Sequence, residues 1–150
     1  MSRIVLLDSG PLGMVTNPRS TPLTLECQLW LDSLPLRGYK PVLPELADYE
    51  VRRELIRAGK VAGIRQLDLL KTLIQYLPIS TDAMLLAAQL WADARLRGRP
   101  TADPNSLDGD VILAAQAILQ ANEGNEVVIA TTNMGHLDQF VDAREWRLIS

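Results

Sequence analysis

Acidic side chains stand at three places in the sequence where secondary structure is predicted to begin or end. Asp8 directly follows an apolar run, IVLL, and precedes a Gly-Pro turn. Glu50 lies in LPELADYEVRREL, and Asp110 leads an apolar, small-residue stretch, DVILAAQA. Carboxylates within a few ångströms of one another repel, so such a cluster either holds a proton or binds a cation. These three residues are therefore the first candidates for a metal site.

The chemistry of such a site follows from its ligand atoms. Oxygen ligands select Mg²⁺ or Mn²⁺ over zinc. One such ion, or two ~3.5 to 4 Å apart, activates water and stabilises the oxygens of an in-line phosphodiester displacement. The sequence therefore predicts metal-dependent nuclease chemistry. The chain has no HExxH pair for zinc, and the lone His136 is at most a supporting residue.

Each acidic residue also has a plainer explanation. Asp8 could only cap the helix that follows it. Glu54 could form a surface ion pair with Arg57. Either Asp108 or Asp110 could cap the last long helix, and we favour Asp110 as the chemical member of that pair because it leads directly into the apolar stretch.

Short polar side chains follow the late apolar run VVIA. They are Thr131, Thr132 and Asn133, with Asp138 five residues beyond Asn133. Asn133 either binds a ligand or stabilises a turn. Because parallel strands present their carboxyl ends at one edge of a sheet, Asp8 and this segment are expected to meet there.

Five runs rich in Val, Ile and Leu predict strands, and stretches of helical period separate them. The runs are 4–7, 41–43, 76–79, 127–130 and 146–149. The predicted helices start near Gly10 or Pro11, at Pro22, at about Glu45 (to Ala58, with Gly59 as its C-cap), at about Ala62, after Ser80 or Thr81 (closed by Gly98), and at about Leu107. This alternation favours a three-layer α/β/α fold with a mostly parallel, five-stranded sheet.

Composition predicts one cytoplasmic domain spanning 1–150. The chain has 150 residues, 47% of them apolar and 22% charged, and a formal charge of -3. One cysteine, Cys27, can form no internal disulfide, and no apolar run approaches the ~18 residues of a membrane span.

The mild acidity weakens the case for tight, non-specific binding of polyanions. The basic residues cluster in two groups, either as solvated faces or as a rim that holds a phosphate backbone. The groups are Arg52, Arg53 and Arg57, and Arg95, Arg97 and Arg99.

Taken together, LLDSGPLG, LPELADYEVRREL, DVILAAQA and VIATTN resemble the PIN-domain ribonucleases, and within them the VapC-like toxins of bacterial toxin–antitoxin pairs. The resemblance covers nearly the whole chain. It implies metal-site and catalytic roles for Asp8, Glu50 and Asp110, with Ser9 and Asn133 as polar supports. It also implies Mg²⁺-dependent cleavage of RNA, a homodimer and inhibition by a cognate antitoxin.

The chain departs from the family pattern at one place. The family often has Asp three residues after this Asn, where this chain has His136. Asp138 could replace the missing acid, Asp108 could supply its charge, or the site could work with three carboxylates.

Two other classes of protein compete with the nuclease. An aspartyl phosphotransfer domain shares the alternating architecture, but Gly10 stands where dehalogenase-like phosphatases need a second Asp, and Asn133 where receiver domains need a Lys. A catalytically impaired PIN-like binding module is the other alternative, because the fourth acid is missing from its usual place.

Overall fold

Five short strands form one sheet in which every recorded pair is parallel. The structure, a computed structural model, describes residues 2–97, 104–135 and 137–150, without the side chains of 104–107. The strands are β1 (Arg3–Leu7), β2 (Tyr39–Pro44), β3 (Gln75–Leu77), β4 (Glu126–Thr131) and β5 (Ala143–Glu145), in the order β3-β2-β1-β4-β5. The predicted sheet is confirmed, and β1 lies at its centre.

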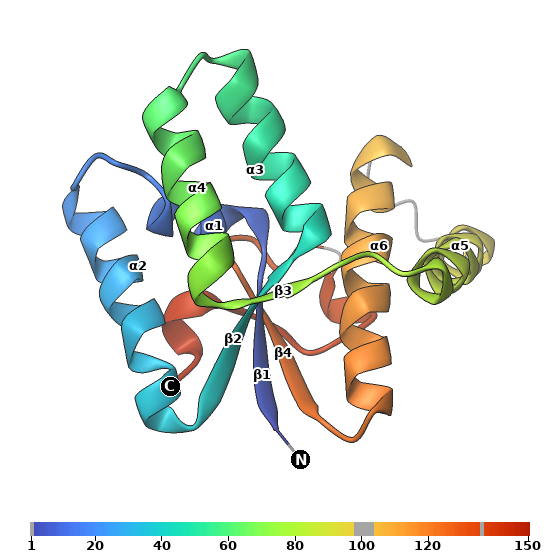
Figure 1. Cartoon of the computed structure of the whole chain (residues 1–150). Helices are drawn as coiled ribbons and strands as arrows, with labels where there is room; N and C mark the ends of the chain where they lie inside the picture. Colours follow the sequence, from blue (N-terminus) through green and yellow to red (C-terminus); the bar gives the residue numbers. More distant parts are fainter. Residues whose placement is uncertain (1, 98–103, 136) are drawn as a thin grey trace.

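Helices cover both faces of the sheet, as the alternating pattern predicted (Figure 1). One side carries α1 (Ser9–Val15), α2 (Pro22–Ser33), α3 (Glu45–Arg57) and α4 (Val61–Leu73). The other carries α6 (Pro104–Asn122), with α5 (Thr81–Leu96) packed against it. The fold is therefore the three-layer α/β/α arrangement.

The central strand shows why the sequence forms this sheet. All four residues of IVLL are buried, as expected of a strand covered by helices on both faces. Val5 and Leu7 belong to the core that also holds Trp30 of α2, whereas Ile4 and Leu6 belong to the core under α6. The alternation fixes which face each side chain covers.

Local capping signals set several helix ends. Thr21 caps α2 in a reciprocal arrangement with Thr24, and Pro22 occupies the first turn. Ser80 caps α5 by accepting a hydrogen bond from the Ala83 amide at 3.1 Å. The C-cap of α3 is Ala58 rather than the predicted Gly59, which follows it with a φ of 66°.

The prediction of a strand over 146–149 is wrong. Residues Trp146–Leu148 form a 3-10 helix, η3, and the last strand is β5, directly before it. Trp146 and Ile149 are buried while Arg147 and Leu148 are exposed. Burial three residues apart suits a 3-10 turn, whereas a strand with one covered face would alternate.

The last long helix begins three residues before the predicted Leu107. Pro104 is its first residue, a position where proline loses no hydrogen bond. Asp108 and Asp110 consequently lie inside α6, so neither is the cap that we expected. The third strand is also shorter than predicted, because it ends at Leu77, before Pro78. Gly98, expected to close α5, and Arg99 lie outside the described residues.

Two further 3-10 turns complete the fold, η1 (Pro35–Arg37) and η2 (Leu137–Gln139). Among the described residues, no helix is both long enough and apolar enough to cross a membrane.

Glycines in α1 offer a test of how closely that helix packs on the sheet. A Cβ at Gly10 would lie 2.7 Å from Thr132 Cγ2, whereas a Cβ at Gly13, in the same helix, would meet nothing within 4 Å. Gly10→Ala should therefore lower the free energy of unfolding by about 1–3 kcal/mol. Gly13→Ala should leave it unchanged or raise it by roughly 0.5–1 kcal/mol. Urea denaturation measures both, and equal effects would contradict this packing.

Candidate active site

Asp8 lies where β1 meets α1 and its carboxylate is held on both sides. Oδ1 accepts a hydrogen bond from the Ser9 amide at 2.8 Å, which makes Asp8 the N-cap of α1. Oδ2 accepts one from the Thr131 hydroxyl, also at 2.8 Å. The Asp8 amide donates to the Ala130 carbonyl at 2.9 Å, continuing the pairing of β1 with β4. The plain explanation, a helix cap, is correct but does not account for the second oxygen.

Thr131 is the residue that connects the late polar segment to Asp8. It is 1% exposed, and its hydroxyl also accepts a hydrogen bond from the Asn133 amide at 3.1 Å. We predicted that Asn133, rather than Thr131, would support the site. The Asn133 side chain accepts from the Gly135 amide at 3.0 Å, which is the turn-stabilising role of the two we considered. The strand register, Leu7 beside Ala130, places Thr131 next to Asp8.

Glu50 reaches from α3 towards α6. The helix buries Ala47 and Val51 against the core, and Glu50 is half-buried at the edge of that stripe, as predicted. A Cβ added to Gly109 would lie 3.2 Å from Glu50 Oε2, so the carboxylate lies against the α6 backbone. Gly109 leaves the room that this approach needs.

Asp110, the residue after Gly109, completes the group. It is half-buried on α6, and its charge acts on Glu50, as does that of Asp8. The structure therefore brings Asp8, Glu50 and Asp110 together, from three elements far apart in the sequence.

The surroundings of Asp8 and Glu50 favour their protonated forms in the absence of a cation. Burial raises the pKa of Asp8, although the hydrogen bonds from Thr131 and Ser9 oppose this. Burial also raises the pKa of Glu50, and the charges of Asp8 and Asp110 add to the rise while Arg53 opposes it. Desolvation disfavours the ionised form of Asp8 and Glu50, and like charge adds to this at Glu50, which is the condition that a bound cation relieves.

The donor set fits a hard divalent cation. Within the described ranges, no three acidic, histidine or cysteine side chains gather closely enough to form one ligand shell. Mg²⁺ is usually held by one or two carboxylates, with water in its other positions. Asp8 with Glu50 or Asp110 would supply that number of oxygen ligands.

The other predicted site residues lie further out. Asp108 is exposed and lines a shallow apolar pocket between α5 and α6 with Met84 and Trp91. Asp138 is exposed on η2. Ser9 contributes its amide to Asp8. His136 lies outside the described residues.

The basic residues divide into paired and available ones. Arg52 binds Asp48 at 2.9 Å and Asp68 at 2.8 Å, and Arg57 binds Glu54 at 2.8 Å. The surface ion pair considered for Glu54 is thus present.

Arg53 differs from its neighbours on α3, because it is exposed and lies over the Tyr49 ring at 5.1 Å. Its positive charge opposes the rise in the pKa of Glu50. In the other basic group, Arg95 lies over Trp91 at 4.9 Å, and Arg97 donates to the Asp93 carbonyl at 3.2 Å.

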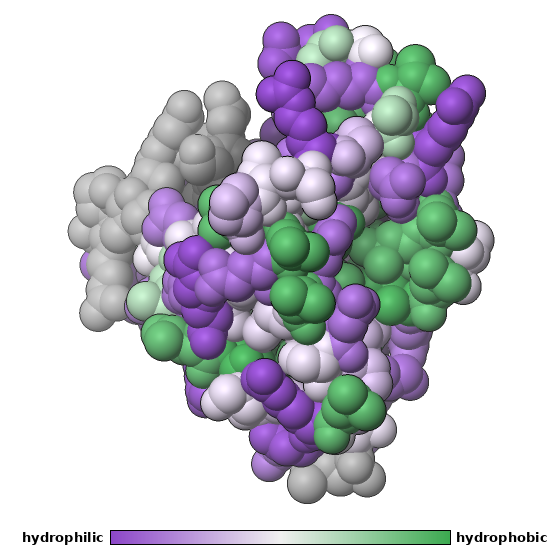
Figure 2. Space-filling view, turned by 90° about the vertical axis from the view of Figure 1, so that its left-hand side faces the viewer, coloured by the Kyte–Doolittle hydropathy of each residue, from purple (hydrophilic) through white to green (hydrophobic). Residues whose placement is uncertain are grey.

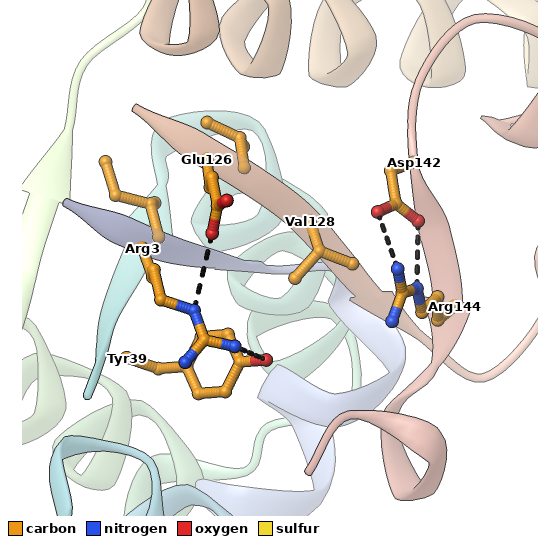
Figure 3. Close-up of a pocket in the computed structure, with 8 residues that line it drawn as sticks. Arg3, Tyr39, Glu126, Val128, Asp142 and Arg144 are labelled. Atoms are coloured by element: carbon orange, nitrogen blue, oxygen red, sulfur yellow. Dashed lines mark hydrogen bonds and ion pairs between the residues drawn. The ribbon is translucent and has the colours of Figure 1, made fainter. Parts of the chain in front are cut away.

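A polar pocket of about 360 Å³ lies towards the opposite ends of the central strands from Asp8 (Figure 3). Arg3 forms an ion pair with Glu126 at 3.4 Å and donates to the Tyr39 hydroxyl at 2.6 Å. Arg144 forms an ion pair with Asp142 at 3.0 Å. The charges therefore neutralise one another within the pocket, and it lacks the unbalanced charge of the Asp8 group.

No family model matches the sequence, and no curated protein matches it either. Solved structures do resemble it. A chain of VapBC2 from Rickettsia felis, solved with a DNA fragment from its promoter, has a TM-score of 0.72 and 12% identity, and the match covers 94% of this chain and 97% of that one. A chain of FitAcB from Neisseria gonorrhoeae has a TM-score of 0.64 and 19% identity, over 97% and 99% of the two chains.

VapC20 from Mycobacterium tuberculosis, a toxin that cleaves the sarcin–ricin loop, is also similar. Its TM-score is 0.61 and its identity 14%, with 92% of this chain and 97% of that chain covered. At such identities the likeness establishes the fold alone. The chain has the PIN-like fold of VapC toxins, which confirms the resemblance at the level of the fold.

The raised pKa values predict how stability depends on pH. Since Asp8 and Glu50 bind protons more tightly in the folded state, their stabilising contribution is complete below the unfolded pKa values of about 4 and is lost as pH rises through the folded ones. Without metal, the free energy of unfolding should fall over this window. Asp8→Asn, which keeps an oxygen for the Ser9 amide, should reduce the fall.

Denaturant titrations in EDTA between pH 4 and 8 measure this dependence. The exposed Asp138→Asn serves as the control and should follow the wild-type curve. A wild-type curve that rises across this range, or an Asp8→Asn curve with the same slope as the wild type, would contradict the assignment.

Proposed function

We propose that this protein is a Mg²⁺- or Mn²⁺-dependent endoribonuclease that hydrolyses RNA phosphodiester bonds and acts as the toxin of a toxin–antitoxin pair. The observation that carries the proposal is that the charges of Asp8, at the end of β1, and of Asp110, on α6, both act on Glu50 of α3. The fold shared with VapC toxins supports the choice of RNA over other phosphodiesters.

The three carboxylates have different roles in this proposal. Asp8 is the fixed ligand, because the Ser9 amide and the Thr131 hydroxyl hold both of its oxygens in place. Glu50 of α3 or Asp110 of α6 would supply a second oxygen ligand, because no three such side chains among the described residues form one ligand shell. A bound divalent cation would activate water and stabilise the charge that develops on the phosphate oxygens. Burial raises the pKa of Glu50 and the charges of Asp8 and Asp110 add to the rise, so the positive charge of a bound cation would favour the ionised form of Glu50.

The proposed site works with three carboxylates. Asp108 faces the apolar pocket between α5 and α6, and Asp138 is exposed on η2. The charges that raise the pKa of Glu50 are those of Asp8 and Asp110. These placements support the three-carboxylate alternative over a substitute fourth acid.

The residues around the site argue against a phosphotransfer domain. Gly10 stands where dehalogenase-like phosphatases need a second Asp, and Asn133 stands where receiver domains need a Lys. A binding module without activity differs from the nuclease in its affinity for metal. Calorimetry with Mn²⁺ on wild type and Asp8→Asn separates these two, because only a working site should bind Mn²⁺ in an Asp8-dependent way.

An antitoxin is the proposed protein partner. Figure 2 shows clusters of apolar side chains on the face of the molecule formed by α2 and α4. Leu29 of α2 is 61% exposed and Leu73 of α4 is 70% exposed. Leu73 also lines a groove between the two helices, together with Leu31, Leu69 and Leu70. Exposed apolar area of this kind marks protein–protein contact. The proposed homodimer stays a prediction.

Removing a carboxylate should abolish cleavage. Asp8→Asn and Asp110→Asn should each lower Mn²⁺-stimulated RNA cleavage by at least about 100-fold, because even residues that only support metal ligands commonly cost 10–100-fold. Asp138→Asn, with the same change of charge, should leave cleavage unchanged. Gel assays on a mixed RNA substrate measure all three. Wild-type cleavage by Asp8→Asn would reject the site, and its loss in Asp138→Asn would restore a fourth acid.

Arg53 should contact the RNA backbone, because it lies beside Glu50 and has no recorded ion pair among the described residues. Arg53→Ala should weaken RNA binding and reduce the slope of log affinity against log salt by about 1. Arg57→Ala is the matched control, because Arg57 is already paired with Glu54. Fluorescence anisotropy with Asp8→Asn as the background measures binding without cleavage. Equal salt slopes in the two variants would exclude a phosphate contact at Arg53.

A further inference from the structure

Tyr49 differs from the other aromatic residues of the chain, because its side chain is exposed. All seven aromatic residues lie in the described part of the structure, and the other six are buried or half-buried. Tyr49 is 56% exposed on α3, and the residue after it is Glu50. The one exposed aromatic ring among the described residues therefore belongs to the residue next to a carboxylate of the proposed site.

Arg53 connects this ring to Glu50 in space. It follows Tyr49 by four residues and Glu50 by three, and both spacings make side chains neighbours on a helix surface. Its guanidinium carbon lies 5.1 Å from the centre of the Tyr49 ring, and its charge acts on Glu50. The ring, the guanidinium and the carboxylate therefore adjoin one another along α3.

A cation–π contact with Arg53 is the plainer explanation for Tyr49, and at exposed sites such contacts stabilise a protein only slightly. This contact accounts for one face of the ring. With Arg53 in place, Tyr49 is still more than half exposed. A flat aromatic surface thus remains available to a ligand.

The pair has the chemistry that recognises single-stranded RNA. Phosphates bind Arg side chains, and unpaired bases stack on aromatic rings. Each nucleotide carries one phosphate and one base, so a cation and a ring in contact with each other match a single nucleotide. A double helix fits this pair poorly, because its bases are already stacked on one another.

We propose that Tyr49 positions the RNA by stacking on the base of the nucleotide whose phosphate contacts Arg53, beside the bond that is cleaved. The proposal rests on the proposed nuclease function and adds a substrate class to it, RNA that is unpaired at this nucleotide. Tyr49 is a positioning residue, because it acts on the base and not on the reacting phosphate.

Variants that keep or remove the ring test the stacking. Fluorescence anisotropy with a short unpaired RNA measures affinity, and Asp8→Asn is the background that leaves the RNA intact. Tyr49→Leu should weaken binding by roughly 5- to 150-fold, which is the range for one stacked base. Tyr49→Phe keeps the ring and should bind within about twofold of the background protein. The side chain is exposed, so both variants should fold.

Leu73→Ala is the matched control for the loss of exposed apolar surface. Leu73 is 70% exposed and lies in the groove between α2 and α4. This variant should bind the RNA as the background protein does.

An abasic nucleotide separates stacking from an indirect effect through Arg53. It keeps the phosphate but lacks the base, so a contribution made through Arg53 persists on abasic RNA and a stacking contribution disappears. The abasic position is moved along the strand, one RNA at a time. On one of these RNAs, Tyr49→Leu and the background protein should bind equally, which is the coupling expected of a ring and a base in contact.

Equal affinities of Tyr49→Leu and the background protein for the intact RNA would overturn the proposal. So would a loss of affinity in Tyr49→Leu that is the same at every abasic position. Cleavage by the protein with Asp8 intact tests the nuclease separately. Cleavage without an effect of Tyr49→Leu rejects the stacking alone, and Tyr49-dependent binding without cleavage rejects the nuclease alone. If the protein binds no RNA, both proposals are rejected.

Discussion

Repulsion between carboxylates held at one edge of a parallel sheet is the constraint around which this molecule is arranged. Asp8, Glu50 and Asp110 would lower their mutual energy by moving apart into water. They stay close because each is carried by an element anchored in the core: β1 between β2 and β4, α3 by Ala47 and Val51, and α6 by Leu113 and Ala117. The free energy of core packing thus offsets the electrostatic repulsion between the carboxylates, which a bound cation or proton would relieve.

Small residues allow these elements to come near enough. Gly10 lets α1 pack against Thr132, and Gly109 lets the Glu50 carboxylate reach the backbone of α6. Ala114 and Ala115 are fully buried on α6, within the tightly packed stretch that follows Asp110. Ala115 belongs to a core cluster with Ala83 and Ala87 of α5, so the small residues of DVILAAQA let α5 and α6 pack closely together.

Much of the fold was predictable because its signals are local. An apolar run such as IVLL, a proline at the first turn of α2 and a serine before α5 each act within a few residues. The predictions of secondary structure were wrong where the local sequence is compatible with two different elements. The segment from Trp146 to Ile149 is apolar enough for a strand, but its buried residues are three apart, which suits a 3-10 turn. The last long helix begins at Pro104, among polar residues that we did not predict to be helical.

The alternating architecture and the acidic residues of the proposed site could be predicted from the sequence alone, because hydrophobic period and residue type are properties of short segments. Which polar groups touch those acidic residues depends on the tertiary structure. Thr131, rather than Asn133, holds Asp8, since the register of β1 with β4 places it there. Likewise, Arg52 forms ion pairs with Asp48 and Asp68, whereas the charge of Arg53 acts on Glu50. Both outcomes depend on contacts between residues distant in the chain, which no local pattern encodes.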